Sequence, residues 1–281
     1  MKVFHHRRDI SQHIASLKKE GKYIGFVPTM GALHDGHISL VRLAKQQNDI
    51  TVVSIFVNPT QFNDKEDLKR YPRDLNADLA LLENKKCDIV FVPDEKEMYP
   101  EPDLRVFSFG NLDKVMEGKY RPGHFNGVTQ IVTKLFDITT PHRAYFGMKD
   151  FQQLAIIRKL VADYGYPVEI IACPIVREAD GLAMSSRNKR LSHEQRKHAA
   201  LISKTLYKAY QTGNSKPFDV IKKNVVDTIN KDPYLEVEYF DIVDEKTLQP
   251  VKDWGIPCRK IGCIAVHAGD VRLIDNITFN S

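Results

Sequence analysis

The sequence predicts an α/β fold: a doubly wound, Rossmann-like parallel sheet followed by a smaller C-terminal α+β domain. Short, nearly continuous apolar runs rich in Val, Ile and Phe alternate with segments of helical spacing through the first two thirds of the chain. Such runs are typical of strands that are covered on both faces, as in a parallel sheet. After residue 176 helical segments come first and strand-like runs follow, which indicates a separate α+β unit.

The first domain is expected to alternate strand and helix. The expected strands span 23–28, 51–58, 88–93, 143–146 and 168–176, and the expected helices span 37–47, 74–85, 128–138 and 151–164. In the last helix Leu154, Ile157 and Val161 recur at steps of three and four, which forms one apolar stripe. Residues 95–127 carry several prolines and glycines and break the alternation, so we expect an insertion there.

The second domain begins with helix signals. Ser192 and Gln195 form a capping-box pattern ahead of a helix to about residue 210, and Pro217 suits the first turn of a helix to about residue 230. Strand-like runs follow at 236–243, 260–268 and 271–274. These signals divide the chain into domains 1–176 and 177–281.

Composition narrows the function classes. The 281 residues are 42% hydrophobic and 27% charged, with a formal net charge of +5, as in an ordinary globular protein. The charge forms no basic tail or stripe, so we expect no nucleic-acid partner, and no window reaches the roughly 20 apolar residues of a membrane span. No apolar stretch follows the first residues, and the four cysteines form no Cys-x-x-Cys pair. We therefore expect a cytoplasmic protein without a signal peptide.

Residues 28–37 (PTMGALHDGH) form the first candidate site, between the first strand and its helix. Ligands of open α/β sheets bind beyond the carboxyl ends of the strands, and a helix N-terminus offers backbone N–H groups and a partial positive charge to an anion. His34 and His37 lie three residues apart and can face one ligand, where imidazoles stabilise phosphate oxygens that gain charge in a transition state. Two surface histidines on a plain turn, or a metal-binding pair, are the alternatives for this pattern. No third ligand with zinc-like spacing follows.

Residues 184–188 (MSSRN) form the second candidate, because two hydroxyls and a guanidinium suit a triphosphate. A His-x-Gly-His sequence after the first strand, paired with such a loop, is similar to the HIGH-motif nucleotidyl transferases. Taken alone, each of these two patterns is also compatible with a solvated loop.

Seven segments in order make the chain resemble the pantothenate synthetase (pantoate–β-alanine ligase) family over essentially its whole length. They are residues 28–37, 57–62 (VNPTQF), 71–74 (YPRD), 121–128 (RPGHFNGV), 146–153 (FGMKDFQQ), 184–188 and 272–276 (RLIDN). The resemblance implies an ATP-dependent condensation of (R)-pantoate with β-alanine to pantothenate. The family reaction passes through a pantoyl adenylate and releases AMP and pyrophosphate. Domain 1–176 would then bind ATP and pantoate, and domain 177–281 would act as a lid.

The resemblance also implies a role for each matching residue. The expected catalytic residues are His34, His37, Lys149, Ser185, Ser186 and Arg187. The expected ATP-binding residues are Met30, Gly31, Ala32, Leu33, His34, Asp35, Gly36, His37, Gly147, Met148, Lys149, Asp150, Val176, Met184, Ser185, Ser186 and Arg187. The expected pantoate- and β-alanine-binding residues are Asn58, Gln61, Tyr71, Arg121, His124 and Gln153.

The family implies Mg²⁺ with the ATP and a homodimer, and no protein ligand of the metal is named. Asp74 and Asp78 are read as solvated carboxylates on a helix surface. Cys263 lies in a strand-like run, so we expect a buried structural thiol rather than a metal site or disulfide with Cys258. A nucleotidyl transferase without an amine site, a tRNA synthetase, and a nucleotide-binding regulatory module without catalysis are the competing classes. A tRNA synthetase would need a basic tRNA-binding extension, which the sequence lacks, and the regulatory module would not need all the phosphate-binding residues.

Overall fold

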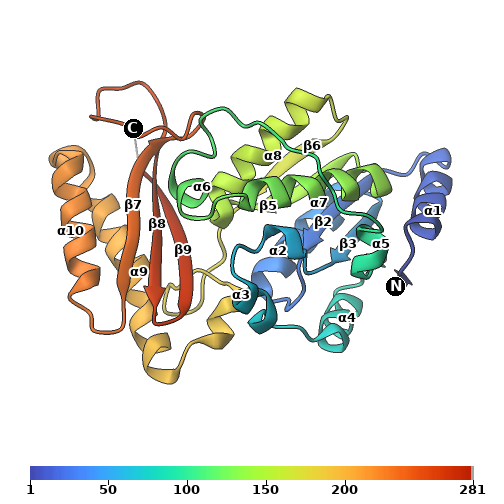
Figure 1. The fold of residues 1–281 in the computed structure, drawn as a ribbon, viewed down its shortest axis with the longest axis horizontal. Helices are drawn as coiled ribbons and strands as arrows, with labels where there is room; N and C mark the ends of the chain where they lie inside the picture. Colours follow the sequence, from blue (N-terminus) through green and yellow to red (C-terminus); the bar gives the residue numbers. More distant parts are fainter. Residues whose placement is uncertain (280–281) are drawn as a thin grey trace. The chain divides into compact units, whose positions relative to one another are not determined.

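The computed structural model describes residues 1–279, without the side chain of Asn214. It divides into two compact units (Figure 1). The first unit comprises Met1–Phe109, Arg121–Met148 and Gln153–Pro174, and the second comprises Gly110–Tyr120, Lys149–Gln152 and Ile175–Ser281. Two short segments that precede residue 175 in the chain therefore belong to the second unit. The functional roles expected for domains 1–176 and 177–281 stay predictions.

The first unit is built on a six-stranded parallel sheet with strand order β1-β4-β3-β2-β5-β6. Its strands are β1 (Lys2–Phe4), β2 (Ile24–Thr29), β3 (Ile50–Ile55), β4 (Ile89–Phe91), β5 (Arg143–Gly147) and β6 (Glu169–Cys173). Its helices are α1 (Arg7–Lys19), α2 (Asp35–Gln47), η1 (Pro59–Gln61), α3 (Lys65–Arg70), α4 (Leu75–Asn84), α5 (Glu95–Met98), α7 (His124–Thr139) and α8 (Phe151–Tyr164). The doubly wound fold class is confirmed.

Helices cover both faces of this sheet. Residues of α2 and α4, among them Val41 and Leu82, pack with Val53 on one face. On the other face α1 contacts α7, and the ring of Phe136 meets that of Phe26 edge-on. The chain crosses from β2 to β3 in one direction and from β5 to β6 in the other, so the strand order reverses between β2 and β5. This reversal is the position at which doubly wound sheets bind their ligands.

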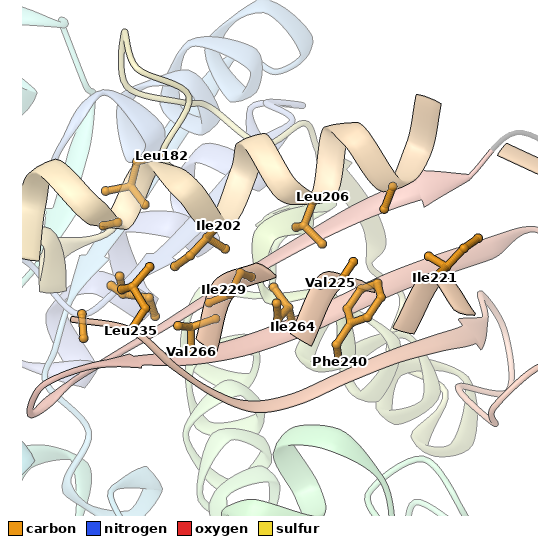
Figure 2. Packing of buried hydrophobic residues seen from close by; sticks show 14 of the residues in the cluster. Leu182, Ile202, Leu206, Ile221, Val225, Ile229, Leu235, Phe240, Ile264 and Val266 are labelled. Carbon is orange, nitrogen blue, oxygen red and sulfur yellow. The ribbon is translucent and has the colours of Figure 1, made fainter. Parts of the chain in front are cut away.

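The second unit carries a three-stranded antiparallel sheet of order β7-β8-β9. Its elements are α6 (Met116–Tyr120), η2 (Met148–Asp150), η3 (Ser186–Arg190), α9 (His193–Thr212), η4 (Gly213–Ser215), α10 (Phe218–Asn230), β7 (Glu236–Asp244), β8 (Lys260–Ala268) and β9 (Val271–Phe279). Ile202 and Leu206 of α9 and Val225 of α10 pack with Phe240 and Ile264 of the sheet in one apolar layer (Figure 2). The expected α+β architecture is confirmed.

Most differences from the sequence-based elements lie at their ends. The capping box of α9 is confirmed, with the Ser192 hydroxyl accepting from the Gln195 backbone N–H. Pro217 is the residue before α10 rather than part of its first turn, and β9 extends to Phe279 instead of ending at residue 274. Strand β1 and helix α1 were not predicted. Within residues 1–279 no helix is long and apolar enough to cross a membrane.

Candidate functional site

The turn after β2 is held by a buried carboxylate. Both oxygens of Asp78, at the start of α4, accept backbone N–H groups: Oδ2 from Ala32 at 2.8 Å and Oδ1 from Leu33 at 2.7 Å. Asp78 is 4% exposed. The prediction of a solvated surface carboxylate is therefore wrong, because Asp78 is buried against the backbone of Leu33, 45 residues away in the sequence. Asp74, in contrast, caps α4 through the Ala77 N–H.

Gly31 is the residue that lets Asp78 approach this turn. Its φ of +78° belongs to the left-handed region, and a side-chain Cβ there would lie 2.9 Å from Asp78 Oδ2. Only glycine meets both conditions without strain. The conformation of residues 30–34 thus depends on a glycine and on a carboxylate from another helix.

His34 and His37 form the capping box of α2 with their own rings. The Nδ1 atom of His34 accepts the Gly36 N–H at 3.1 Å, and Nδ1 of His37 accepts the His34 N–H at 3.3 Å. A neutral imidazole that accepts through Nδ1 carries its proton on Nε2. The ring centroids lie 4.0 Å apart. The backbone therefore selects one tautomer for both rings and makes each Nε2–H a donor.

Several backbone N–H groups of this turn bond within the protein. Those of Ala32, Leu33, His34 and Gly36 have the acceptors described above, and Gly31 donates to the Thr29 hydroxyl at 3.2 Å. The expectation that this turn binds an anion stays a prediction, with the two imidazole Nε2–H groups as its side-chain donors.

Five of the expected site residues form a connected chain of contacts at the carboxyl end of the first unit's strands. The Asn58 amide donates to Gln61 Oε1 at 3.2 Å and to the Gly127 carbonyl at 3.0 Å, and Gln61 Nε2 contacts the Met30 sulfur at 3.0 Å. Asn58 Oδ1 accepts the Tyr99 hydroxyl at 2.7 Å. Asn58 is 1% exposed and its amide makes these bonds, so it orients Gln61. Its expected role in substrate binding stays a prediction.

His124 and Arg121 complete this chain. The Nδ1 of His124 bonds the Gln61 carbonyl at 2.8 Å, and its Nε2 lies 3.2 Å from an Arg121 nitrogen. Since a guanidinium can only donate, Nε2 accepts and the His124 proton resides on Nδ1. This tautomer is the opposite of that in His34 and His37. Gly127 lets α7 approach the segment of Thr60 and Gln61 closely, because a Cβ at this position would clash with the Thr60 carbonyl.

Tyr71 and Gln153 are two further expected residues of the first unit. Tyr71 is 6% exposed, and its ring meets that of Phe62 edge-on at 5.7 Å between centroids. Gln153 is half-buried on the first turn of α8. Gly147 ends β5, next to the reversal of strand order, and Met148 begins η2.

The remaining expected ATP-binding residues lie in the second unit. Lys149 Nζ is 3.7 Å from the Asp150 carboxylate. Residues 176–184 form a narrow hairpin in which the Met184 N–H donates to the Val176 carbonyl at 3.0 Å. The Ser185 hydroxyl caps η3 through the Arg187 N–H at 3.3 Å, and Ser186 is buried. The hairpin therefore joins Val176 directly to the loop of Ser185, Ser186 and Arg187.

Sequence reasoning missed the residues that support these groups. Asp78, Tyr99 and Glu117 were not among the expected site residues, although each is bonded to an expected one or to a segment beside it. Burial raises the pKa of Tyr99 to about 12, so its hydroxyl stays protonated and continues to donate to Asn58. A buried carboxylate or phenol on an otherwise polar segment gives no periodic signal by which it could be found.

Comparisons with known proteins agree over the whole chain. A family model for pantoate-beta-alanine ligase matches residues 2–278. A pantothenate synthetase of Bacteroides fragilis is 56% identical over 99% of both chains, and one of Porphyromonas gingivalis is 51% identical over 99% of both chains. The crystal structure of a pantothenate synthetase from Thermus thermophilus matches with a TM-score of 0.92 at 42% identity, covering 99% of each chain. A pantoate-beta-alanine ligase from Francisella tularensis, solved with beta-gamma ATP and beta-alanine, matches with a TM-score of 0.83 at 36% identity over 99% of this chain and 97% of the other.

Proposed function

Since the chain belongs to the pantoate–β-alanine ligase family and joins pantoate to β-alanine with ATP, we propose that its reaction passes through a pantoyl adenylate and releases AMP and pyrophosphate. The observation that carries this proposal is the pair of imidazoles at the reversal of strand order, both fixed with Nε2–H as donor. Donors fixed in advance suit a step in which charge grows on phosphate oxygens.

The first step is nucleophilic substitution at phosphorus. A carboxylate oxygen of pantoate bonds to the α-phosphorus of ATP while the bond from that phosphorus to the bridging oxygen breaks, and pyrophosphate leaves with the electron pair. The protein contributes position and electrostatic stabilisation rather than a covalent group. We assign His34 and His37 to the phosphate oxygens, and Lys149, Ser185, Ser186 and Arg187 to the same triphosphate. Asp150 and the Val176 backbone are assigned to the ribose and the adenine.

The second step makes the amide. The amine of β-alanine attacks the acyl carbon of the adenylate, the carbon–oxygen bond to AMP breaks, and the nitrogen loses a proton. We assign the pantoate hydroxyls to Gln61 and Gln153, because an amide can both donate to a hydroxyl and accept from it. Gln61, Tyr71, Arg121 and His124 are assigned to the acid and amine substrates, with Asn58 orienting Gln61. The contacts among Asn58, Gln61 and His124 support this assignment.

We further propose that Mg²⁺ takes part as the complex with ATP. Mg²⁺ commonly keeps several waters and binds through substrate phosphates, where it neutralises their charge. No group of three or more His, Cys, Asp and Glu side chains that could hold a metal occurs among residues 1–279, and both oxygens of Asp78 accept backbone N–H bonds. No residue of the chain is therefore assigned as a ligand of the ion.

A homodimer in the cytoplasm completes the proposal. The four cysteines are free of disulfides, which supports a reducing compartment. Leu104 and Val106 are 86% and 85% exposed on an extended segment, which supports an interface with a second copy.

Pyrophosphate exchange tests the stepwise reaction. The enzyme is supplied with ATP, Mg²⁺, pantoate and excess labelled pyrophosphate, without β-alanine. We expect label to enter ATP, and omission of pantoate to stop the exchange, because no other carboxylate attacks the α-phosphorus. An acid quench after a single turnover looks for the adenylate directly, which guards against slow pyrophosphate release. Amide formation without either exchange or adenylate would overturn the stepwise route, and ADP as product would point to an acyl phosphate.

A further inference from the structure

The segment 272–276 (RLIDN) of β9 resembles the family, but the proposed reaction gives it no ligand. Side chains of a strand alternate between the two faces of its sheet. Val271 and Leu273 lie in the apolar layer with α9 and α10, so Arg272 and Asn276 belong to the opposite face. Polar side chains on that face are not part of the apolar core between the sheet and the two helices.

Arg272 binds the segment Gly110–Tyr120 to this face. Its guanidinium donates to both carboxylate oxygens of Glu117 in α6, at 2.6 and 2.8 Å, and the Tyr239 hydroxyl donates to the same carboxylate at 2.9 Å. Glu117 is 6% exposed. Burial by itself would lower the pKa of Arg272, but the bonds to Glu117 and Glu238 raise it overall, so the ion pair stays charged.

The segment Gly110–Tyr120 in turn holds the stretch that contains Lys149. Gln152, 4% exposed, donates to the Leu112 carbonyl at 2.6 Å and to the Val115 carbonyl at 2.9 Å. The segments Gly110–Tyr120 and Lys149–Gln152 are therefore bonded to each other as well as to β9.

Asn276 reaches Lys149 directly. Its Nδ2 donates to the Lys149 carbonyl at 3.0 Å, and the amide is 4% exposed. The bond fixes the backbone of the residue whose ammonium we assign to the triphosphate. A side chain on a held backbone reaches its ligand with less loss of conformational freedom.

Asp275 fixes the other nucleotide-binding segment. Its two oxygens accept from the Arg177 guanidinium at 2.7 and 3.0 Å, and its carboxylate is almost completely buried. Arg177 follows Val176 and pairs across the hairpin with Ala183, next to Met184. Two neighbouring residues of β9 thus have separate roles: Asn276 bonds the backbone at Lys149, and Asp275 holds the side chain of Arg177 at the base of the hairpin.

We propose that Asp275 and Asn276 are positioning residues for ATP: they align Lys149 and the hairpin of residues 176–184 without touching the nucleotide. This inference rests on the proposed assignment of Lys149 and Val176 to ATP. It predicts that damage to either bond weakens ATP binding selectively and leaves pantoate binding nearly unchanged. A purely structural role would instead lower the amount of folded enzyme and affect both substrates equally.

The test compares KM for ATP, KM for pantoate, kcat and Tm among single variants of the full chain. Asn276→Asp keeps the side-chain shape and removes the N–H donor, and Asn276→Ala is the second variant should the new carboxylate impair folding. Asp275→Asn removes the charge that faces Arg177. Lys149→Ala is the reference, and Asn230→Asp and Asp241→Asn introduce the same chemical changes elsewhere in the second unit.

We expect both Asn276 variants and Asp275→Asn to raise KM for ATP about three- to tenfold, the range that one hydrogen bond represents, with KM for pantoate changed less than about twofold. The two controls should leave both constants unchanged. A raised KM for ATP in Lys149→Ala, with unchanged values in both Asn276 variants and in Asp275→Asn, would overturn this inference alone. An unchanged KM for ATP in Lys149→Ala would overturn the assignment of Lys149 and, with it, the positioning role. Equal increases for both substrates would show a structural role only.

Discussion

The tautomers of three histidines follow from single hydrogen bonds to the backbone or to a guanidinium. His34 and His37 accept through Nδ1, while His124 accepts from Arg121 through Nε2. The first pair can therefore donate through Nε2, whereas His124 uses Nδ1 to hold the Gln61 carbonyl. The hydrogen-bond partners of each histidine thus decide which of its ring nitrogens can donate.

Capping and phosphate stabilisation can be separated at His34. Asn is among the best residues at a helix N-cap, so His34→Asn should preserve α2, but its shorter side chain lacks the Nε2–H donor. We expect Tm to remain close to that of the wild type and kcat to fall by about 10²–10³, the usual effect of losing one such donor. Steady-state kinetics and thermal unfolding measure the two effects.

His37→Ala is the comparison for this prediction. It removes both the donor and the ring that accepts the His34 N–H, so kcat should fall by a similar factor and Tm should fall as well. Near-normal turnover in either variant would remove that histidine from the mechanism.

The local bonding of the expected site residues could be predicted from the sequence only in part, and their roles stay predictions. The spacing of His34 and His37 correctly suggested that the two rings lie together, and their centroids are 4.0 Å apart. The burial of Asp78 depends on a turn 45 residues earlier, and no local pattern contains that information.

At the scale of elements, prediction succeeded where the signal is local. The capping residues of α9 and the apolar stripe of α8 lie within one or two helical turns, and both helices form as expected. Helix α1 was missed although Ile10 and Ile14 are buried at helical spacing, because its remaining residues are mostly polar. The attachment of α6 to β9 joins Glu117 to Arg272 across 155 positions, so only the fold reveals it.

The extended segment around Asp103 is anchored by its alternate residues. Asp103 accepts from Arg105 at 2.6 and 2.9 Å and lies 3.3 Å from Lys134 of α7. The amides of Asn126 and Gln130 in α7 bond the Arg105 carbonyl. Odd-numbered positions therefore face α7, and Leu104 and Val106 face outward.

This anchor predicts a pH-dependent stability. Hydrogen bonds from Arg105, and to a smaller extent from Lys134, hold the pKa of Asp103 below its usual range. A carboxyl with a lowered folded-state pKa contributes its stability fully above the unfolded value of about 3.9, and loses it as the pH falls toward the folded value. We expect the wild type to have a higher Tm than Asp103→Asn at pH 7, and the difference to shrink below about pH 4.

Asp163→Asn is the control for this pH dependence, since its pair with Lys159 is partly exposed to solvent and should contribute little at any pH. A Tm difference between wild type and Asp103→Asn that stays constant from about pH 7 to about pH 3 would show that the carboxylate charge does not stabilise this segment.

In the whole molecule, the two units are not two continuous stretches of the sequence. The second unit includes Gly110–Tyr120 and Lys149–Gln152 together with everything from Ile175 onward. A change of composition along the chain locates the large C-terminal part but not these two short stretches. They belong to the second unit because side chains such as Asn276 and Arg272 bond them there.

The proposed homodimer can be tested by substitution of Leu104 and Val106, the outward-facing residues of the segment around Asp103. Leu104 and Val106 are more exposed than the other large apolar side chains of residues 1–279. Covering such side chains stabilises association by about 25 cal/mol for each Å² of apolar surface removed from water. Their backbone lies on an extended stretch whose odd positions are already bonded to α7, so a second copy can approach without rearranging the first.

We expect the variant with both Leu104→Asp and Val106→Glu to dissociate into monomers, because charges at these positions would be buried unpaired in the interface. Light scattering coupled to size-exclusion chromatography measures the mass, and an unchanged Tm for the first unit would show that the fold is intact. Val220→Glu adds a charge at another exposed valine, 42% exposed on α10, and should leave the mass unchanged. If the double variant keeps the mass of a dimer, the interface lies elsewhere on the molecule. If the wild type is itself a monomer at micromolar concentration, the homodimer proposal is wrong, and the exposure of Leu104 and Val106 needs a different partner.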